Sequence, residues 1–129
     1  RNTSKQMIQF NAVVGNPPYQ VMDGGAKASA SLVYHIFVEL SIKLSPNFIS
    51  MIMPARWYTG GKGLDEFRDK LMKSKKIQSL FDFFDPNDVF PGVDISGGVC
   101  YFLYDKYYNG LCNVNNYREG CKTHHLENY

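Results

Sequence analysis

The chain has 129 residues, of which 44% are hydrophobic and 15% aromatic, and this composition predicts one globular domain and excludes a disordered chain. A formal net charge of +2 is too small to indicate nucleic-acid binding by itself. No apolar run is long enough to span a membrane, and three cysteines without a CxxC pair favour reduced thiols in the cytoplasm. Cys121, His124 and His125 lack a fourth ligand at the usual spacing, so we expect no metal site.

A first strand is predicted at residues 8–15, and it runs directly into Asn16-Pro17-Pro18-Tyr19. Two prolines remove two backbone donors and disfavour the helical conformation for the residue before each of them. The strand must therefore end here, and Asn16 cannot begin a helix. Acceptor oxygens on a stiff turn beside an aromatic ring suit recognition of a planar molecule that carries an NH₂ group. The alternative is a plain turn, which Asn-Pro often opens.

Residues 20–27 contain two consecutive glycines and are predicted to form a loop, after which Ser29 or Ser31 can cap a helix. Apolar residues recur in this helix at three- and four-residue spacing, which predicts a buried stripe. The members of the stripe are Leu32, Val33, Ile36, Phe37, Leu40 and Leu44. His35 lies on the opposite face of the helix, so we expect it to be solvated.

A second buried strand is predicted at residues 48–53, where Pro54 stops an apolar run. The glycine-rich loop at residues 60–63 lacks the ending of a Walker loop, and a mobile connection is the better interpretation. A helix is predicted from Leu64 to about Ser74, with acidic residues in its first turn and lysines towards its end. Its predicted buried stripe consists of Leu64, Phe67 and Leu71.

A third strand is predicted at residues 77–84 and a fourth at residues 99–104. The Asn109-Gly110 pair is a strong hairpin signal and predicts a further strand at residues 111–117, followed by a polar tail that frays. The order strand–helix–strand–helix–strand–strand predicts an α/β fold with right-handed crossovers. Ligands bind beyond the carboxyl ends of such strands. Three loops, at residues 16–19, 54–57 and 85–92, are therefore expected to face one cleft.

The tetrapeptide, the Ile52-Met53-Pro54 run with its glycine loop, and the Leu-x-x-Phe-Arg-x-x-Leu helix together resemble the adenine-N6 DNA methyltransferases of type II restriction–modification systems. Residues 88–95 and the following Gly-Gly-Val-Cys-Tyr-Phe-Leu run look like the segment that these enzymes carry between their last two sheet strands. The resemblance extends to about Lys106. It implies the C-terminal half of a Rossmann-like methyltransferase sheet, from its fourth strand onward and with the last strand antiparallel. Residues 1–129 would then be a partial catalytic domain, with an extra hairpin and tail at residues 107–129.

The resemblance also implies a chemistry that uses S-adenosylmethionine as methyl donor. The side-chain oxygen of the motif asparagine and the next carbonyl accept the two amine hydrogens of adenine in this family. Carried over, these groups are Asn16, which would also contact part of the cofactor, and the carbonyl of Pro17. Tyr19 would stack on the base after it leaves the duplex, and Phe90 is a candidate for its other face or for an ordinary core role. The candidates for contact with DNA phosphates are Arg56 and Lys62.

The chain departs from the family pattern in lacking the glycine-rich cofactor loop, the acidic residue for the ribose and a target-recognition domain. We therefore expect a piece of a longer enzyme for double-stranded DNA that lacks its N-terminal half and is inactive alone. The exposed first strand is expected to pair with a second copy. Two alternatives stay open: a glutamine methyltransferase acting on release factors, and a non-catalytic α/β interaction module in which residues 16–19 are only a turn.

Overall fold

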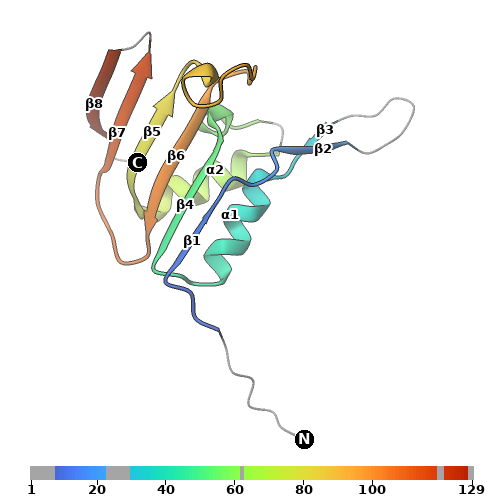
Figure 1. The fold of residues 1–129 in the computed structure, drawn as a ribbon. Helices are drawn as coiled ribbons and strands as arrows, with labels where there is room; N and C mark the ends of the chain where they lie inside the picture. The colour runs from blue at the N-terminus through green and yellow to red at the C-terminus, as the bar shows by residue number, and fades with distance from the viewer. Residues whose placement is uncertain (1–7, 23–29, 62, 119–120, 128–129) are drawn as a thin grey trace, which may run out of the picture.

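The computed structural model describes residues 8–22, 30–61, 63–118 and 121–127. The strands in chain order are β1 (Ala12–Gly15), β2 (Gln20–Met22), β3 (Ala30–Leu32), β4 (Phe48–Pro54), β5 (Ile77–Phe83), β6 (Val99–Asp105), β7 (Cys112–Arg118) and β8 (Cys121–Glu127). The helices are α1 (Tyr34–Lys43) and α2 (Asp65–Ser74), with short 3₁₀ turns at Ala55–Thr59 and Pro86–Asp88. Figure 1 shows these elements as a main sheet, a small ribbon and two helices behind the sheet.

The main sheet has the strand order β1-β4-β6-β5-β7-β8, and β2 and β3 form the separate antiparallel ribbon. β1 is parallel to β4, and β6 lies antiparallel between β4 and β5. This confirms the predicted α/β fold, in which the strand at residues 99–104, now β6, is antiparallel to its neighbours. The crossovers β1–α1–β4 and β4–α2–β5 advance in the same direction across the sheet, so their right-handedness places both helices on one face (Figure 1).

The core lies between this face of the sheet and the two helices. On α2 the predicted stripe is confirmed, because Leu64, Phe67 and Leu71 are at most 2% exposed. The other face of the sheet carries no helix among the residues that the structure describes. Its aromatic rings stack across neighbouring strands instead, with centroid distances of 4.6 Å between Phe81 and Tyr101 and 4.5 Å between Phe83 and Tyr117. This face therefore consists largely of half-buried aromatic surface.

The prediction for α1 was wrong about which side is buried. The residues predicted to be buried at its centre and end are between 40% and 52% exposed: Ile36, Phe37, Leu40 and Leu44. The buried side is formed by Tyr34, Val38 and Ser41, which recur at the same helical spacing. The helix thus has two apolar sides, and the described sheet covers one of them. His35 is not solvated, since its ring packs against Tyr34 and Phe67.

The N-terminal elements also differ from the prediction. The first strand begins at Ala12 rather than at residue 8, and residues 20–22 of the predicted loop form β2. Ser31 lies in β3 and does not cap α1, whose preceding residue, Val33, makes no side-chain capping bond; Ser29 lies outside the described residues. The helix starts without a side-chain cap because Val33, at its N-cap position, has no side-chain acceptor.

The Asn109-Gly110 turn does not form the predicted hairpin. Both edges of β6 are already occupied by β4 and β5, so the next strand, β7, joins the outer edge of β5 in parallel. The tail expected to fray contributes β8, which pairs antiparallel with β7. The side chains of Cys121, His124 and His125 lie outside what the structure describes. No helix within the described ranges is long and apolar enough to cross a membrane.

Candidate active site

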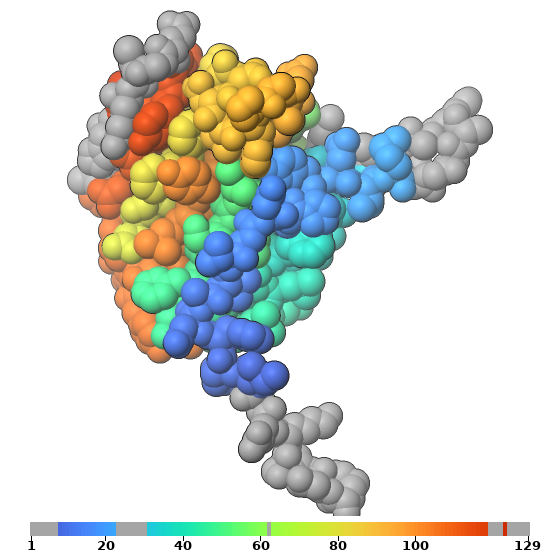
Figure 2. Space-filling view, viewed as in Figure 1, coloured from blue at the N-terminus to red at the C-terminus, as the bar shows by residue number. Residues whose placement is uncertain are grey.

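A pocket of about 670 Å³ opens beyond the carboxyl ends of β1 and β4. Three loops line it together, as the strand order predicted, and they contribute residues 16–20, Pro54 with Arg56, and several residues between positions 90 and 96. Figure 2 shows the segment after β1, in blue, beside the yellow and orange loop that precedes β6. The predicted loop residue Trp57 does not reach the pocket, because it is 2% exposed and lies in the core.

Asn16 follows β1 directly and lies exposed at this pocket. None of the described residues hydrogen-bonds to its side-chain amide or to the carbonyl of Pro17. The strand before it is fixed by its parallel pairing, in which Gly15 lies opposite Met51. The ring of Pro17 is buried, which anchors the turn in the protein while the amide of Asn16 is left accessible. Both residues line the pocket, and neither acceptor oxygen is taken by a hydrogen bond from a described residue.

Tyr19 is one of the residues that line the same pocket, and its half-buried side chain also packs against the core. Its hydroxyl oxygen is buried without a partner among the described residues. Its carbonyl accepts a hydrogen bond of 3.1 Å from the backbone N–H of Val33, which ties the loop to the start of α1. Burial raises the pKa of Tyr19, and the nearby Cys100 adds to the shift. The phenol is therefore neutral at physiological pH, and the ring can offer only its apolar surface and π face.

The loop that carries Phe90 is braced by its own side chains. One carboxylate oxygen of Asp85 accepts bonds from the backbone N–H and from the side-chain amide of Asn87, both at 3.0 Å. The side-chain oxygen of Asn87 in turn accepts a bond of 2.8 Å from the N–H of Gly92. This network fixes the loop, and half-buried Phe90 lines the same pocket as Tyr19.

The loop returns to the sheet through Gly98. This residue lies against the backbone at the end of β5 and is hydrogen-bonded to the segment after β4. Its N–H donates to the carbonyl of Ile95, and its carbonyl accepts from the N–H of Ala55, both at 3.1 Å. Gly98 has a φ of +83°, and a Cβ there would lie 2.3 Å from the carbonyl oxygen of Phe83. A side chain does not fit at this position, so glycine is required for the loop to reach the pocket.

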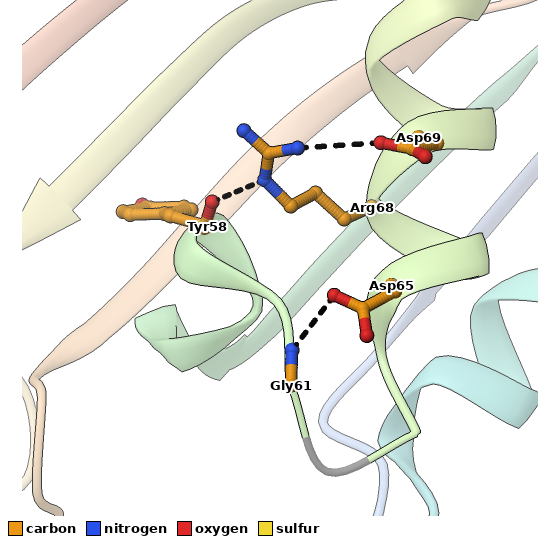
Figure 3. Close-up of polar contacts among 5 residues, drawn as sticks. All are labelled: Tyr58, Gly61, Asp65, Arg68 and Asp69. Carbon is orange, nitrogen blue, oxygen red and sulfur yellow. Dashed lines mark hydrogen bonds and ion pairs between the residues drawn. The ribbon is translucent and has the colours of Figure 1, made fainter.

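The two predicted phosphate contacts have different outcomes. Arg56 is exposed and lines the pocket, whereas Lys62 lies outside the described residues. The ends of the glycine loop around Lys62 are tied to α2 (Figure 3). The N–H of Gly61 donates to Asp65 at 3.0 Å, and Arg68 donates to the carbonyl of Tyr58. The amide of Gly61 is thus already bonded to a carboxylate, and the mobility expected of residues 60–63 stays a prediction.

A second pocket, of about 330 Å³, lies on the helical face between α2, β5 and β7. Trp57 and Tyr58 form part of its wall, and the hydroxyl of Tyr58 donates to Asp82 at 3.2 Å. Burial raises the pKa of the Asp82 carboxyl. This pocket was not predicted, because it depends on the pairing of β7 with β5, which the hairpin prediction missed.

The model of the Eco57I restriction-modification methylase family matches residues 2–90. An uncharacterized adenine-specific methylase of Mycoplasma pneumoniae is 36% identical over 116 residues, which are 88% of this chain and 28% of that protein. The present chain therefore spans little more than a quarter of that relative.

Two solved structures share the fold at low sequence identity. The methyltransferase subunit of a type I restriction-modification system from Streptococcus thermophilus superimposes with a TM-score of 0.65 at 13% identity, over 90% of this chain and 28% of the subunit. A chain from a type I restriction-modification complex gives a TM-score of 0.61 at 15% identity, over 84% of this chain and 23% of that one. At these identities the likeness shows the fold, which is part of a Rossmann-like methyltransferase sheet.

Proposed function

Because the chain belongs to the Eco57I restriction-modification methylase family, we propose that it forms the catalytic-motif half of an enzyme that methylates the N6 amine of adenine in double-stranded DNA. One observation carries the proposal. The oxygen acceptors of Asn16 and Pro17 are unoccupied by described residues at the mouth of a pocket that Tyr19 also lines. The proposal places the enzyme in the cytoplasm, with the DNA that it modifies.

The proposed chemistry explains why acceptors are needed. The exocyclic amine of adenine is a poor nucleophile because its lone pair is delocalised into the ring. Asn16 Oδ1 and the Pro17 carbonyl would accept the two amine hydrogens and favour a tetrahedral nitrogen with its lone pair free to attack. S-adenosylmethionine, when bound, supplies an electrophilic methyl group on a sulfonium. Acceptors fixed before the reaction stabilise the developing charge, and each contributes about 2–4 kcal/mol in comparable sites.

A base inside a duplex cannot reach this pocket, so the target adenine must leave the stack. We propose that the ring of Tyr19 lies against one face of the extruded base and that Phe90 approaches the other. Both residues line the pocket. The carbonyl of Tyr19 is bonded to the N–H of Val33, and the backbone of Phe90 is bonded within its own loop to Pro86 and Val93. Arg56 at the rim would contact a phosphate, as would Lys62.

For the cofactor, the described pocket offers Asn16 as a partial contact, and most of its binding site belongs to the proposed N-terminal half.

The test is an assay of the full-length protein with radiolabelled S-adenosylmethionine and two acceptors, unmethylated duplex DNA and a translation release factor. We expect the label in DNA as N6-methyladenine, identified by mass spectrometry after digestion. Label in a release-factor glutamine would support the alternative amide methyltransferase. Absence of label from both acceptors would support the non-catalytic interaction module and would overturn the proposal.

The outer edge of β1 is the proposed place for the rest of the domain. Within the described part of the chain no strand pairs with this edge, and Val14 on β1 is 77% exposed. The apolar side of α1 left open by the sheet is also exposed. Parallel strands normally have neighbours and helical cover on both faces. We propose that the cofactor-binding half of the methylase covers these surfaces and that a separate target-recognition domain completes it.

Without that half, the 129-residue chain is expected to self-associate through β1. Light scattering should show a weight-average mass that rises with concentration towards a dimer or beyond. Val14→Lys places a charge on the open edge and should shift the mass towards the monomer. Tyr107→Lys is the matched control, because it places the same charge at a position that is 75% exposed and far along the chain. A monomer at every concentration would contradict the prediction.

A further inference from the structure

Three buried polar atoms beside the candidate site have no hydrogen-bond partner among the described residues: the hydroxyls of Tyr19 and Tyr34 and Nδ1 of His35. Tyr34 is the first residue of α1 and is 0% exposed. An unpartnered buried hydroxyl is costly, so the contacts recorded for Tyr34 that can favour this position are those of its ring. Burial raises the pKa of Tyr34 to about 12, and the phenol is therefore neutral.

The ring of Tyr34 is the aromatic neighbour of Tyr19 that the structure records. Their centroids are 6.4 Å apart and their planes make an angle of 76°, so one ring meets the other edge to face. The ring of Tyr34 also contacts the ring of His35, with a centroid distance of 6.0 Å. The ring of His35 in turn contacts that of Phe67 on α2, with a centroid distance of 5.8 Å. This series of edge-to-face ring contacts connects the pocket loop to the buried core.

A backbone hydrogen bond also connects the loop that carries Tyr19 to the start of α1. Val33, the residue before Tyr34, donates to the carbonyl of Tyr19 at 3.1 Å. The position of the Tyr19 backbone and the tilt of its ring are thus both set at the first turn of α1. A ring that stacks on a base must present its face at a defined angle, because stacking weakens when the planes are inclined.

We propose that Tyr34 is a positioning residue that sets the tilt of the Tyr19 ring at the target-base site and that it acts through its ring rather than its hydroxyl. The inference rests on the proposed function and deepens it. Tyr34 touches neither base nor cofactor in this account. It gives a role to an aromatic ring that is fully buried at the first position of α1.

The experiment compares Tyr34→Leu with Tyr34→Phe in the full-length protein. Unmethylated duplex DNA with the target adenine serves to measure the KM, and a second duplex with 2-aminopurine in its place, which has no N6 amine to methylate, serves only to report base extrusion by fluorescence. The phenylalanine variant keeps the ring and should stay within about twofold of the wild type. The leucine variant should raise the KM for DNA by about tenfold, within the range that base–aromatic stacking supplies, and should lower the 2-aminopurine signal of base extrusion. The KM for S-adenosylmethionine should not change.

Two controls separate positioning from general loss of stability. Val38→Ala opens a cavity on the same buried side of α1 without a recorded contact to Tyr19, and it should leave the KM for DNA unchanged. Adding Tyr34→Leu to Tyr19→Ala should cause no further rise in KM, because a residue that acts through Tyr19 has no effect once that ring is gone. If Tyr34→Leu does not fold, Tyr34→Met takes its place.

An active enzyme whose Tyr34→Leu variant keeps the wild-type KM for DNA and fluorescence would overturn the inference alone. Equal losses in the phenylalanine and leucine variants would also overturn it, because the hydroxyl would then be the acting group. A wild-type protein that transfers no methyl group to DNA would overturn the proposed function and the role of Tyr34 with it.

Discussion

Replacing Asn16 with alanine in the full-length protein is expected to reduce kcat for methyl transfer to DNA by about two orders of magnitude or more. The substitution removes one of the two acceptors proposed to bind the amine while leaving the pocket rings in place. Its effect should fall mainly on kcat, because the acceptor binds most strongly when charge develops on the nitrogen. Initial rates with labelled S-adenosylmethionine at saturating DNA measure this loss.

Stability should be almost unaffected by the same change, since the side chain of Asn16 is exposed and no described residue bonds to it. Asn109→Ala is the matched control, because it removes the same amide from an exposed position outside the residues that line the pocket. It should keep wild-type rates. If Asn16→Ala retained activity within a few-fold of the wild type, residues 16–19 would be only a turn, and the interaction-module alternative would be favoured.

Gly98→Ala is expected to lower the free energy of unfolding by about 3 kcal/mol or more, the combined cost of left-handed strain and overpacking. The new Cβ would lie 2.3 Å from the carbonyl oxygen of Phe83 and 3.0 Å from that of Phe84, and these backbone atoms cannot turn aside as a flexible side chain can. The bonds from Gly98 to Ile95 and Ala55 would be displaced with it. Denaturant titration monitored by circular dichroism measures the change.

Gly97→Ala provides the comparison for this prediction. Gly97 also has a positive φ, of +88°, but the nearest atom to its added Cβ is Cβ of Arg56 at 3.9 Å, an ordinary contact. Its cost should therefore be limited to the backbone strain, about 1–2 kcal/mol. Equal losses for the two variants would show that the close approach to Phe83 does not matter.

The sequence predicted the parts of the molecule whose pattern admits one interpretation. The bounds of β4 and α2 were predicted to within one residue. The run before Pro54 is almost entirely apolar, and α2 has a single apolar side, so neither pattern has a second interpretation. The three-loop cleft followed from the order of elements alone. The pattern of α1 admits two buried sides, and only the packing of Tyr34 and Val38 against β4 decides between them.

Strand pairing was the least predictable feature, since it depends on which edges are already taken. The Asn109-Gly110 turn is compatible with a hairpin, yet β6 has no open edge for β7. The ring contact between Tyr19 and Tyr34 has no sequence signal either, because the segment between them includes the β2–β3 ribbon. The second pocket was missed for the same reason as the place of β7.

The position of β6 between β4 and β5 determines when the site can be completed. β4 and β5 both pair with β6 and not with each other. Their facing edges therefore have no hydrogen-bond partner until β6 is inserted between them. A nascent chain that has emerged only as far as the Phe90 loop lacks the bond that connects this loop to Ala55, because the acceptor is the carbonyl of Gly98, directly before β6. During synthesis the loop with the acceptor oxygens therefore emerges before β6, and the opposite wall of the pocket is fixed only after β6 has emerged. Assembly of the pocket is thus coupled to the insertion of a single late strand.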